Sequence, residues 1–164
     1  MISEPISPLF RIINGRIPAA MFVSPDESSL DAVLDAQKRG KIGSAYVEIV
    51  ISCNDNAKSL TIAASEEIAT AVVPHNYSED SDAVENLLAL LDEHEIGLIV
   101  IDNFPCKLDD EIRRRYKGRI IVVQPSLMPA FFEDDLHGID IQKAVLNYGS
   151  KVAGATVYIL GDTP

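Results

Sequence analysis

Residues 119–131 read RIIVVQPSLMPAF. The apolar run at 119–123 predicts a strand, because short apolar runs bounded by turn residues are typical of buried strands. Gln124 follows this strand, and Pro125 and Pro129 come directly after it. Two prolines at this spacing behind an apolar strand are uncommon, so this stretch is the most specific motif in the chain.

The rest of the chain alternates short apolar runs with helical patterns, which indicates a sheet with crossover helices. Apolar residues three and four apart, as in Val84, Leu87 and Leu91, predict a helix. We therefore expect an α/β domain over residues 17–164 with a Rossmann-like, doubly wound, mostly parallel sheet, preceded by an irregular arm over residues 1–16. The predicted strands are 19–23, 45–52, 70–73, 97–101, 119–123 and 152–160, and the predicted helices are 25–38, 59–67, 80–94, 108–116 and 139–148.

The composition fits one compact domain. The chain has 164 residues, of which 47% are hydrophobic, and this is enough to bury a core. No segment is apolar over the length that a bilayer requires, and the first residues lack a signal-peptide pattern, so we expect a cytoplasmic protein. The net charge of −11 argues against nucleic acid or an anionic membrane as a partner, because both attract basic surfaces. Two cysteines, Cys53 and Cys106, are too few for a disulfide framework and are expected to be reduced thiols.

Five segments between Pro18 and Thr163 match the motifs of one protein family. They are Val23–Ser24 with Leu30, Val50–Ser52, Leu98–Ile101 with Phe104 and Leu108, Pro125–Phe131, and Gly154–Tyr158. In these segments the chain resembles the glycinamide ribonucleotide formyltransferase family. The resemblance implies the formyltransferase fold, and it implies the transfer of a formyl group from 10-formyltetrahydrofolate to a primary amine in purine biosynthesis.

The resemblance places the catalytic Asn and His of the family at Val122 and Gln124. The catalytic Asp would follow Pro164, the last residue of the sequence, and Tyr158 stands where the family has another His. Formyl transfer passes through an oxyanion and requires a proton to leave the amine. Val122 donates no hydrogen bond, and the Gln124 amide cannot carry charge or move a proton near neutral pH. We therefore expect an impaired reaction, since each missing oxyanion donor costs about a hundred- to a thousandfold in rate.

The turn after the first strand is where the resemblance implies a phosphate site, built from backbone N–H groups at a helix start. Here it reads Ser24-Pro25-Asp26-Glu27. Pro25 has no N–H, and Asp26 and Glu27 would repel a phosphate, so we expect this site to be lost. The same residues predict a capping box, with Ser24 as N-cap, Pro25 at the first helical position and Glu27 three residues after the cap. Ile62 stands where relatives commonly have an Arg, which further weakens the nucleotide site.

The loop after the fourth strand is where the resemblance implies the folate cleft, with the pterin held largely by backbone groups. Phe104 and Leu108 match the family pattern, whereas Pro105, Cys106 and Lys107 depart from it. Binding of 10-formyltetrahydrofolate through this loop is therefore expected to be weak or lost, with a folate as the candidate small-molecule ligand.

The histidines and acidic clusters do not indicate a metal site or a catalytic site. His75, His94 and His137 are far apart in the sequence and lack ligand spacing, so we expect no metal site. Cys106 has no His in its own motif, so a nucleophilic role is not expected. Gln124 and Tyr158 also have structural interpretations, as a strand-end residue and as cover for one sheet face.

These departures point in one direction, and the sequence therefore predicts a catalytically impaired or inactive paralogue, a pseudoenzyme. One alternative is a working formyltransferase or formyltetrahydrofolate hydrolase that uses Gln124, Tyr158 and an acid beyond residue 164. Another is a protein-interaction module on a vestigial enzyme fold. Because the fold is C-terminally short by comparison with the family, we also expect the apolar run 155–160 to be incompletely covered and to favour a homo-oligomer or a protein partner.

Overall fold

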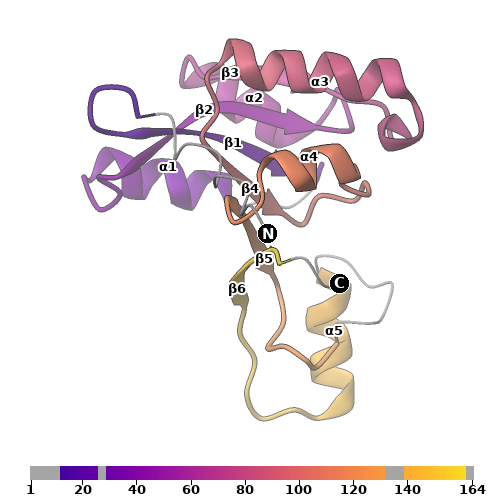
Figure 1. The fold of residues 1–164 in the computed structure, drawn as a ribbon. Coiled ribbons are helices and arrows are strands. Elements are labelled where there is room, and N and C mark those ends of the chain that lie inside the picture. The colour runs from indigo at the N-terminus through magenta and orange to yellow at the C-terminus, as the bar shows by residue number, and fades with distance from the viewer. Residues whose placement is uncertain (1–11, 26–28, 132–138, 162–164) are drawn as a thin grey trace, which may run out of the picture.

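The computed structural model describes residues 12–25, 29–131 and 139–161, which form one six-stranded sheet with flanking helices (Figure 1). The strands are β1 (Ile17–Val23), β2 (Ala45–Ser52), β3 (Ala69–Val72), β4 (Leu98–Asp102), β5 (Ile120–Gln124) and β6 (Thr156–Ile159). They lie in the order β3-β2-β1-β4-β5-β6. Neighbours from β3 to β5 are parallel and β6 is antiparallel to β5, so the predicted mostly parallel α/β sheet is confirmed.

The helices follow the predicted alternation closely. They are α1 (Leu30–Lys38), α2 (Lys58–Ser65), α3 (Ser81–Glu93), α4 (Asp110–Arg115) and α5 (Ile139–Tyr148), with a short 3-10 helix η1 (Tyr77–Glu79) before α3. Two predicted boundaries are wrong. The helix α1 begins at Leu30 and not at residue 25, and the strand β6 begins at Thr156 and not at residue 152.

Helices pack on both faces of the sheet, as a doubly wound fold requires. Successive side chains of a strand point to opposite faces. Ala20 and Phe22 of β1 therefore join one buried cluster, and Met21 and Val23 join another. The first cluster is completed by α3 and α4 through Val84, Leu87, Leu91 and Ile112, and the second by α1 and α2 through Leu30, Leu34, Leu60 and Ala63. Figure 1 shows α3 and α1 on opposite sides of the sheet.

The strand order reverses beside β1. The chain leaves β1 through α1 toward β2 on one side, and it returns through α3 to β4 on the other side. This arrangement pairs Val23 with Asp102 at the carboxyl ends of β1 and β4, and the Ser24 N–H donates to the Asp102 carbonyl oxygen over 3.1 Å. Ligands of open α/β sheets bind outside the strand ends at such a switch point, so this is where a site is expected.

The last two described elements project from the rest of the molecule (Figure 1). Val157 and Ile159 of β6 are 65% and 63% exposed, and Leu146 and Tyr148 of α5 are 75% and 82% exposed. The prediction that the apolar run 155–160 is incompletely covered is confirmed for these two strand residues. The association expected from it stays a prediction.

None of the described helices has the length and apolar character needed to cross a bilayer. The cytoplasmic location stays a prediction. Most of the predicted N-terminal arm, residues 1–11, lies outside the described residues, and within its remainder Ile13 and Arg16 form an isolated antiparallel bridge. The division into an arm and a domain is therefore still a prediction.

Candidate functional site

A carboxylate from β4 occupies the start of α1. Both the backbone N–H and the hydroxyl of Ser29, the N-cap residue, donate to Oδ2 of Asp102, the hydroxyl over 2.9 Å. Asp102 is only 6% exposed. Since a helix start carries a partial positive charge and unpaired N–H groups, it attracts an anion. In this chain the anion comes from the protein itself.

The predicted capping box is wrong. Ser24 is not the N-cap of α1, because the helix begins five residues later than the sequence pattern suggested, after Ser29. Ser24 is instead a buried residue whose N–H bonds to the end of β4, and the Pro25 carbonyl accepts from the N–H of Lys58, the first residue of α2, over 3.3 Å. Asp26 and Glu27 lie outside the described residues.

Sequence reasoning missed Asp102 as a site residue. The sequence did indicate this residue, because an Asp directly after the apolar run 98–101 lies at the carboxyl end of a strand that neighbours β1 in a doubly wound sheet. Ile62, the other predicted nucleotide-site residue, packs against the apolar cluster under α1 and α2.

Two of the family-like motifs are joined by hydrogen bonds. The Thr156 hydroxyl donates to the Ser126 carbonyl over 2.7 Å and accepts from the Met128 N–H over 3.0 Å. The two motifs also pack closely at Gly154, where an added Cβ would come within 2.9 Å of Leu127 Cδ2 and would make the Leu127 side chain shift. The Pro125–Phe131 turn is therefore fixed against the strand that carries Tyr158.

The positions where the resemblance predicts the reacting residues of the family lie on β5. Val122 is the register partner of Tyr158 across β5 and β6, and Gln124 is the partner of Thr156. The Gln124 amide nitrogen donates to the Ser126 hydroxyl over 3.4 Å, so one of its two N–H donors is used locally. Burial raises the pKa of the Tyr158 phenol, which keeps it protonated at neutral pH. The phenol is thus a hydrogen-bond donor and a poor base.

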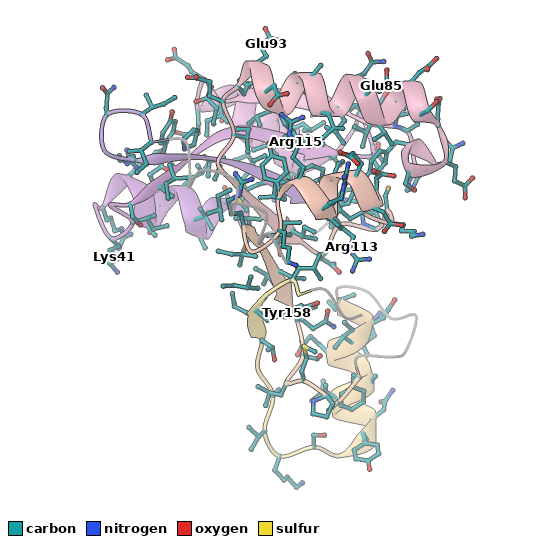
Figure 2. All side chains as sticks on the ribbon, in the orientation of Figure 1. Lys41, Glu85, Glu93, Arg113, Arg115 and Tyr158 are labelled. Carbon is teal, nitrogen blue, oxygen red and sulfur yellow. The ribbon has the colours of Figure 1, made fainter. Side chains whose placement is uncertain are left out.

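An open groove of about 660 Å³ runs along these residues. Its apolar lining is joined by two cations, Lys107 and Arg113. Figure 2 shows Arg113 projecting from α4 toward the part of the molecule that carries Tyr158. Among the described residues that line it there is no histidine and no carboxylate. The lining is Ile101, Cys106, Lys107, Leu108, Arg113, Val122, Met128, Tyr158, Ile159, Leu160 and Gly161.

Two of the three predicted folate-loop residues, Cys106 and Leu108, line this groove. Phe104 belongs to the core, because its ring packs edge-on against Phe22 with 5.3 Å between ring centroids and lies 6.4 Å from the ring of Tyr77. Its match to the family pattern is explained by packing.

Cys106 has no histidine in its own motif, but a histidine from another segment lies beside it. Its Sγ lies 3.6 Å from Nδ1 of His75, and the two atoms lie within 4.8 Å of the Cys53 Sγ. Burial, together with the hydrogen bond to Cys53, raises the pKa of Cys106 to about 12. Both cysteines are free thiols, as predicted. Of the other two histidines, His94 contacts Glu48 over 3.1 Å, and residue 137 lies outside the described part of the chain.

With this geometry established, comparison with known proteins gives a consistent result. A family model described as formyl transferase matches residues 18–163. Phosphoribosylglycinamide formyltransferase of Bacillus subtilis is 28% identical over 144 residues, which are 87% of this chain and 71% of that protein. The chloroplastic phosphoribosylglycinamide formyltransferase of Arabidopsis thaliana is 26% identical over 145 residues, 87% of this chain and 49% of that protein. The trifunctional purine biosynthetic protein adenosine-3 of Gallus gallus is 25% identical over 153 residues, 93% of this chain and 15% of that protein.

Solved structures agree with this comparison. Phosphoribosylglycinamide formyltransferase of Coxiella burnetii, solved in complex with CHES, has a TM-score of 0.74 at 27% identity over 90% of this chain and 67% of that one. A formyltetrahydrofolate deformylase of Pseudomonas syringae has a TM-score of 0.74 at 17% identity, over 91% of this chain and 47% of that one, which shows the shared fold alone. The chain thus spans about half or less of the Arabidopsis and chicken proteins and about two thirds of the Coxiella structure.

The Asp102 contact at the start of α1 yields a stability prediction. Asp102→Ala leaves the Ser29 N–H and hydroxyl without their acceptor and should lower the free energy of unfolding by about 1–3 kcal/mol. Asp102→Asn keeps an acceptor oxygen and should cost less. The control Asp35→Ala removes an exposed ion pair with Arg39 and should change the value by under about 0.5 kcal/mol. Urea unfolding measures all three, and equal effects of Asp102→Ala and Asp35→Ala would contradict the role of Asp102.

Proposed function

The chain belongs to the formyl transferase family, and from this premise we propose that it is a catalytically impaired relative of phosphoribosylglycinamide formyltransferase. The observation that carries the proposal is the Asp102 carboxylate bonded to Ser29 at the start of α1. This is the helix start at which the family resemblance places the ribonucleotide phosphate.

A phosphate at the start of α1 would meet the negative charge of Asp102 and, at Ser29, a donor that is already used. Two like unit charges 4 Å apart repel by about 4 kcal/mol at an effective dielectric constant of 20, and a phosphate dianion doubles this. The Ser29 N–H is already bonded, and Pro25 has no N–H to offer. Binding of a ribonucleotide through its phosphate is therefore disfavoured by charge and by geometry.

The reacting positions support the same conclusion. Val122 supplies no donor for an oxyanion, and the Gln124 amide is bonded to Ser126. The raised pKa of Tyr158 prevents it from accepting the amine proton near neutral pH. An active formyltransferase or a hydrolase that relied on Gln124 and Tyr158 would therefore lack a base among the described groove residues.

The groove itself suits a folate better than it suits catalysis. Leu108, Val122 and Met128 give apolar surface for a flat ring system. Lys107 and Arg113 are cations that can attract carboxylates, although Arg113 also pairs with Asp110 over 3.7 Å. A reduced folate such as 10-formyltetrahydrofolate has both parts. We infer weak folate binding by residues 17–164 without efficient transfer of the formyl group.

Steady-state assays with 10-formyltetrahydrofolate and glycinamide ribonucleotide test the proposal. Turnover should stay below about 0.1 per second, a hundredth of the ~10 per second of an ordinary enzyme, because nucleotide site and proton carrier are both altered. The Bacillus subtilis relative serves as the positive control. The double variant Val122→Asn/Gln124→His should remain below the same limit, since Asp102 still occupies the helix start.

Formate release in the absence of the ribonucleotide is measured in the same assay. Turnover above about 0.1 per second with the ribonucleotide would establish a working formyltransferase, and the same rate without it would establish a hydrolase. Either result overturns the proposal.

A protein-interaction role is the second candidate, favoured by the exposed face of β6. Val157 and Ile159 lie opposite Val123 and Ile121 on one face of the sheet, and the two β6 side chains are about two-thirds exposed. Exposed apolar strand surface promotes association.

Light scattering after gel filtration should therefore detect an oligomer at micromolar concentrations. The double variant Val157→Lys/Ile159→Lys should be monomeric, because lysines on an edge strand oppose pairing. The control Val152→Lys, an exposed residue outside the strands, should associate like the parent chain. A parent chain that is monomeric throughout this range would contradict self-association.

A further inference from the structure

Three side chains from distant parts of the sequence meet at the carboxyl edge of the sheet. Cys53 directly follows β2, His75 lies three residues after β3, and Cys106 lies four residues after β4. Parallel strands end at the same edge, which brings these side chains together. The Cys106 Sγ and His75 Nδ1 are 3.6 Å apart, and all three ligand atoms lie within 4.8 Å of one another.

These distances fit a tetrahedral metal centre. With metal–sulfur bonds of about 2.3 Å and metal–nitrogen bonds of about 2.05 Å, a tetrahedral ion separates its sulfur and nitrogen ligands by about 3.6 Å. The observed separation of Sγ and Nδ1 has this value. We propose that Cys53, His75 and Cys106 form a binding site for one thiophilic divalent cation, with Zn²⁺ as the ion of matching geometry and ligand preference.

The charges and the surroundings suit this ion. Two thiolates balance the double charge, which allows a centre built on the buried Cys53. Beside the cluster an open groove of about 480 Å³ is lined by Cys53, Asn54, Asp55 and His75 among others. The groove leaves space beside Cys53 and His75 for a water as the fourth ligand.

Binding exchanges protons for the metal. Each thiol loses its proton when its sulfur becomes a ligand, and the neutral His75 binds through Nδ1, so one cation releases two protons from the cysteines. No oxidant or reductant takes part. A disulfide between Cys53 and Cys106 would consume both sulfurs, require an oxidant and leave the contact with His75 unused.

The metal site shares Cys106 with the large groove, but it does not depend on the proposed function. Cys106 lies between Phe104, which packs in the core, and Leu108, which lines the large groove. A bound cation would tie this loop to the ends of β2 and β3. Metal binding would then raise the stability of the folded chain by mass action, whether or not the groove accepts a folate.

Titration of the reduced, metal-free chain with Co²⁺ under anaerobic conditions tests the site directly. We expect one Co²⁺ per chain, with the intense visible bands and thiolate charge-transfer band of a four-coordinate ion. Binding of Co²⁺ to the metal-free chain should release two protons, and one equivalent of Zn²⁺ should then remove these bands without further proton release. Zn²⁺ should also raise the Tm of the parent chain, which is a readout that needs no variant.

Ligand variants locate the site. Each ligand variant should weaken Zn²⁺ binding at least about a hundredfold: Cys53→Ser, Cys106→Ser and His75→Ala. Mutations of residues that only contact a metal ligand already weaken binding by up to about a hundredfold, so the loss of a ligand should cost at least as much. His94→Ala, which alters a histidine paired with Glu48 outside the cluster, should bind like the parent chain. Circular dichroism establishes that each variant is folded.

Three results would overturn the proposal. The first is an absence of stoichiometric Co²⁺ binding by the parent chain, or a spectrum of six-coordinate Co²⁺ without thiolate bands. The second is equal affinity for Zn²⁺ in folded Cys106→Ser and His94→Ala. The third is a Cys53–Cys106 disulfide in chain isolated anaerobically with Zn²⁺ present.

Discussion

The hydrogen bonds between the Asp102 carboxylate and Ser29 are the interaction on which the rest of the site depends. They join the end of β4 to the start of α1 across the switch point of the sheet, where a fold of this kind exposes its ligand site. A buried carboxylate is costly unless it is hydrogen-bonded, and the helix start supplies both the donors and a favourable dipole. The protein thereby satisfies with its own side chain the position that an open site would offer to an external anion.

The sheet topology brings different residue types to three places along the carboxyl edge of the sheet. At the switch point it closes the helix start, and between β4, β5 and β6 it leaves a groove whose described lining combines apolar surface with Lys107 and Arg113. On the other side of Phe104 it gathers two thiols and an imidazole. The fold of a formyl transferase is thus retained, and the described residues at this edge include apolar, amide, thiol and cationic groups.

The sequence predicted the sheet well because each strand is a short apolar run bounded by turn residues, as at 119–123 and 98–101. The start of α1 was mispredicted because Ser24 and Glu27 match a local capping pattern, and a long-range bond to Asp102 decides where the helix begins. The positions Val122 and Gln124 followed from a motif, and of the two only Val122 lines the groove. The cluster of Cys53, His75 and Cys106 could not be predicted from spacing, since only the strand order brings these residues together.

The closed nucleotide site requires that the Ser29 N–H is not available to a substrate phosphate. An amide nuclear magnetic resonance titration measures this availability directly. Glycinamide ribonucleotide is added to ¹⁵N-labelled chain while the Ser29 cross-peak is followed, with Asp102→Asn as the matched variant. The account predicts no saturable shift of this peak up to about 1 mM ligand, because the amide stays bonded to Asp102. A saturable shift at micromolar concentrations would show that the ribonucleotide displaces the carboxylate, and it would contradict a closed nucleotide site.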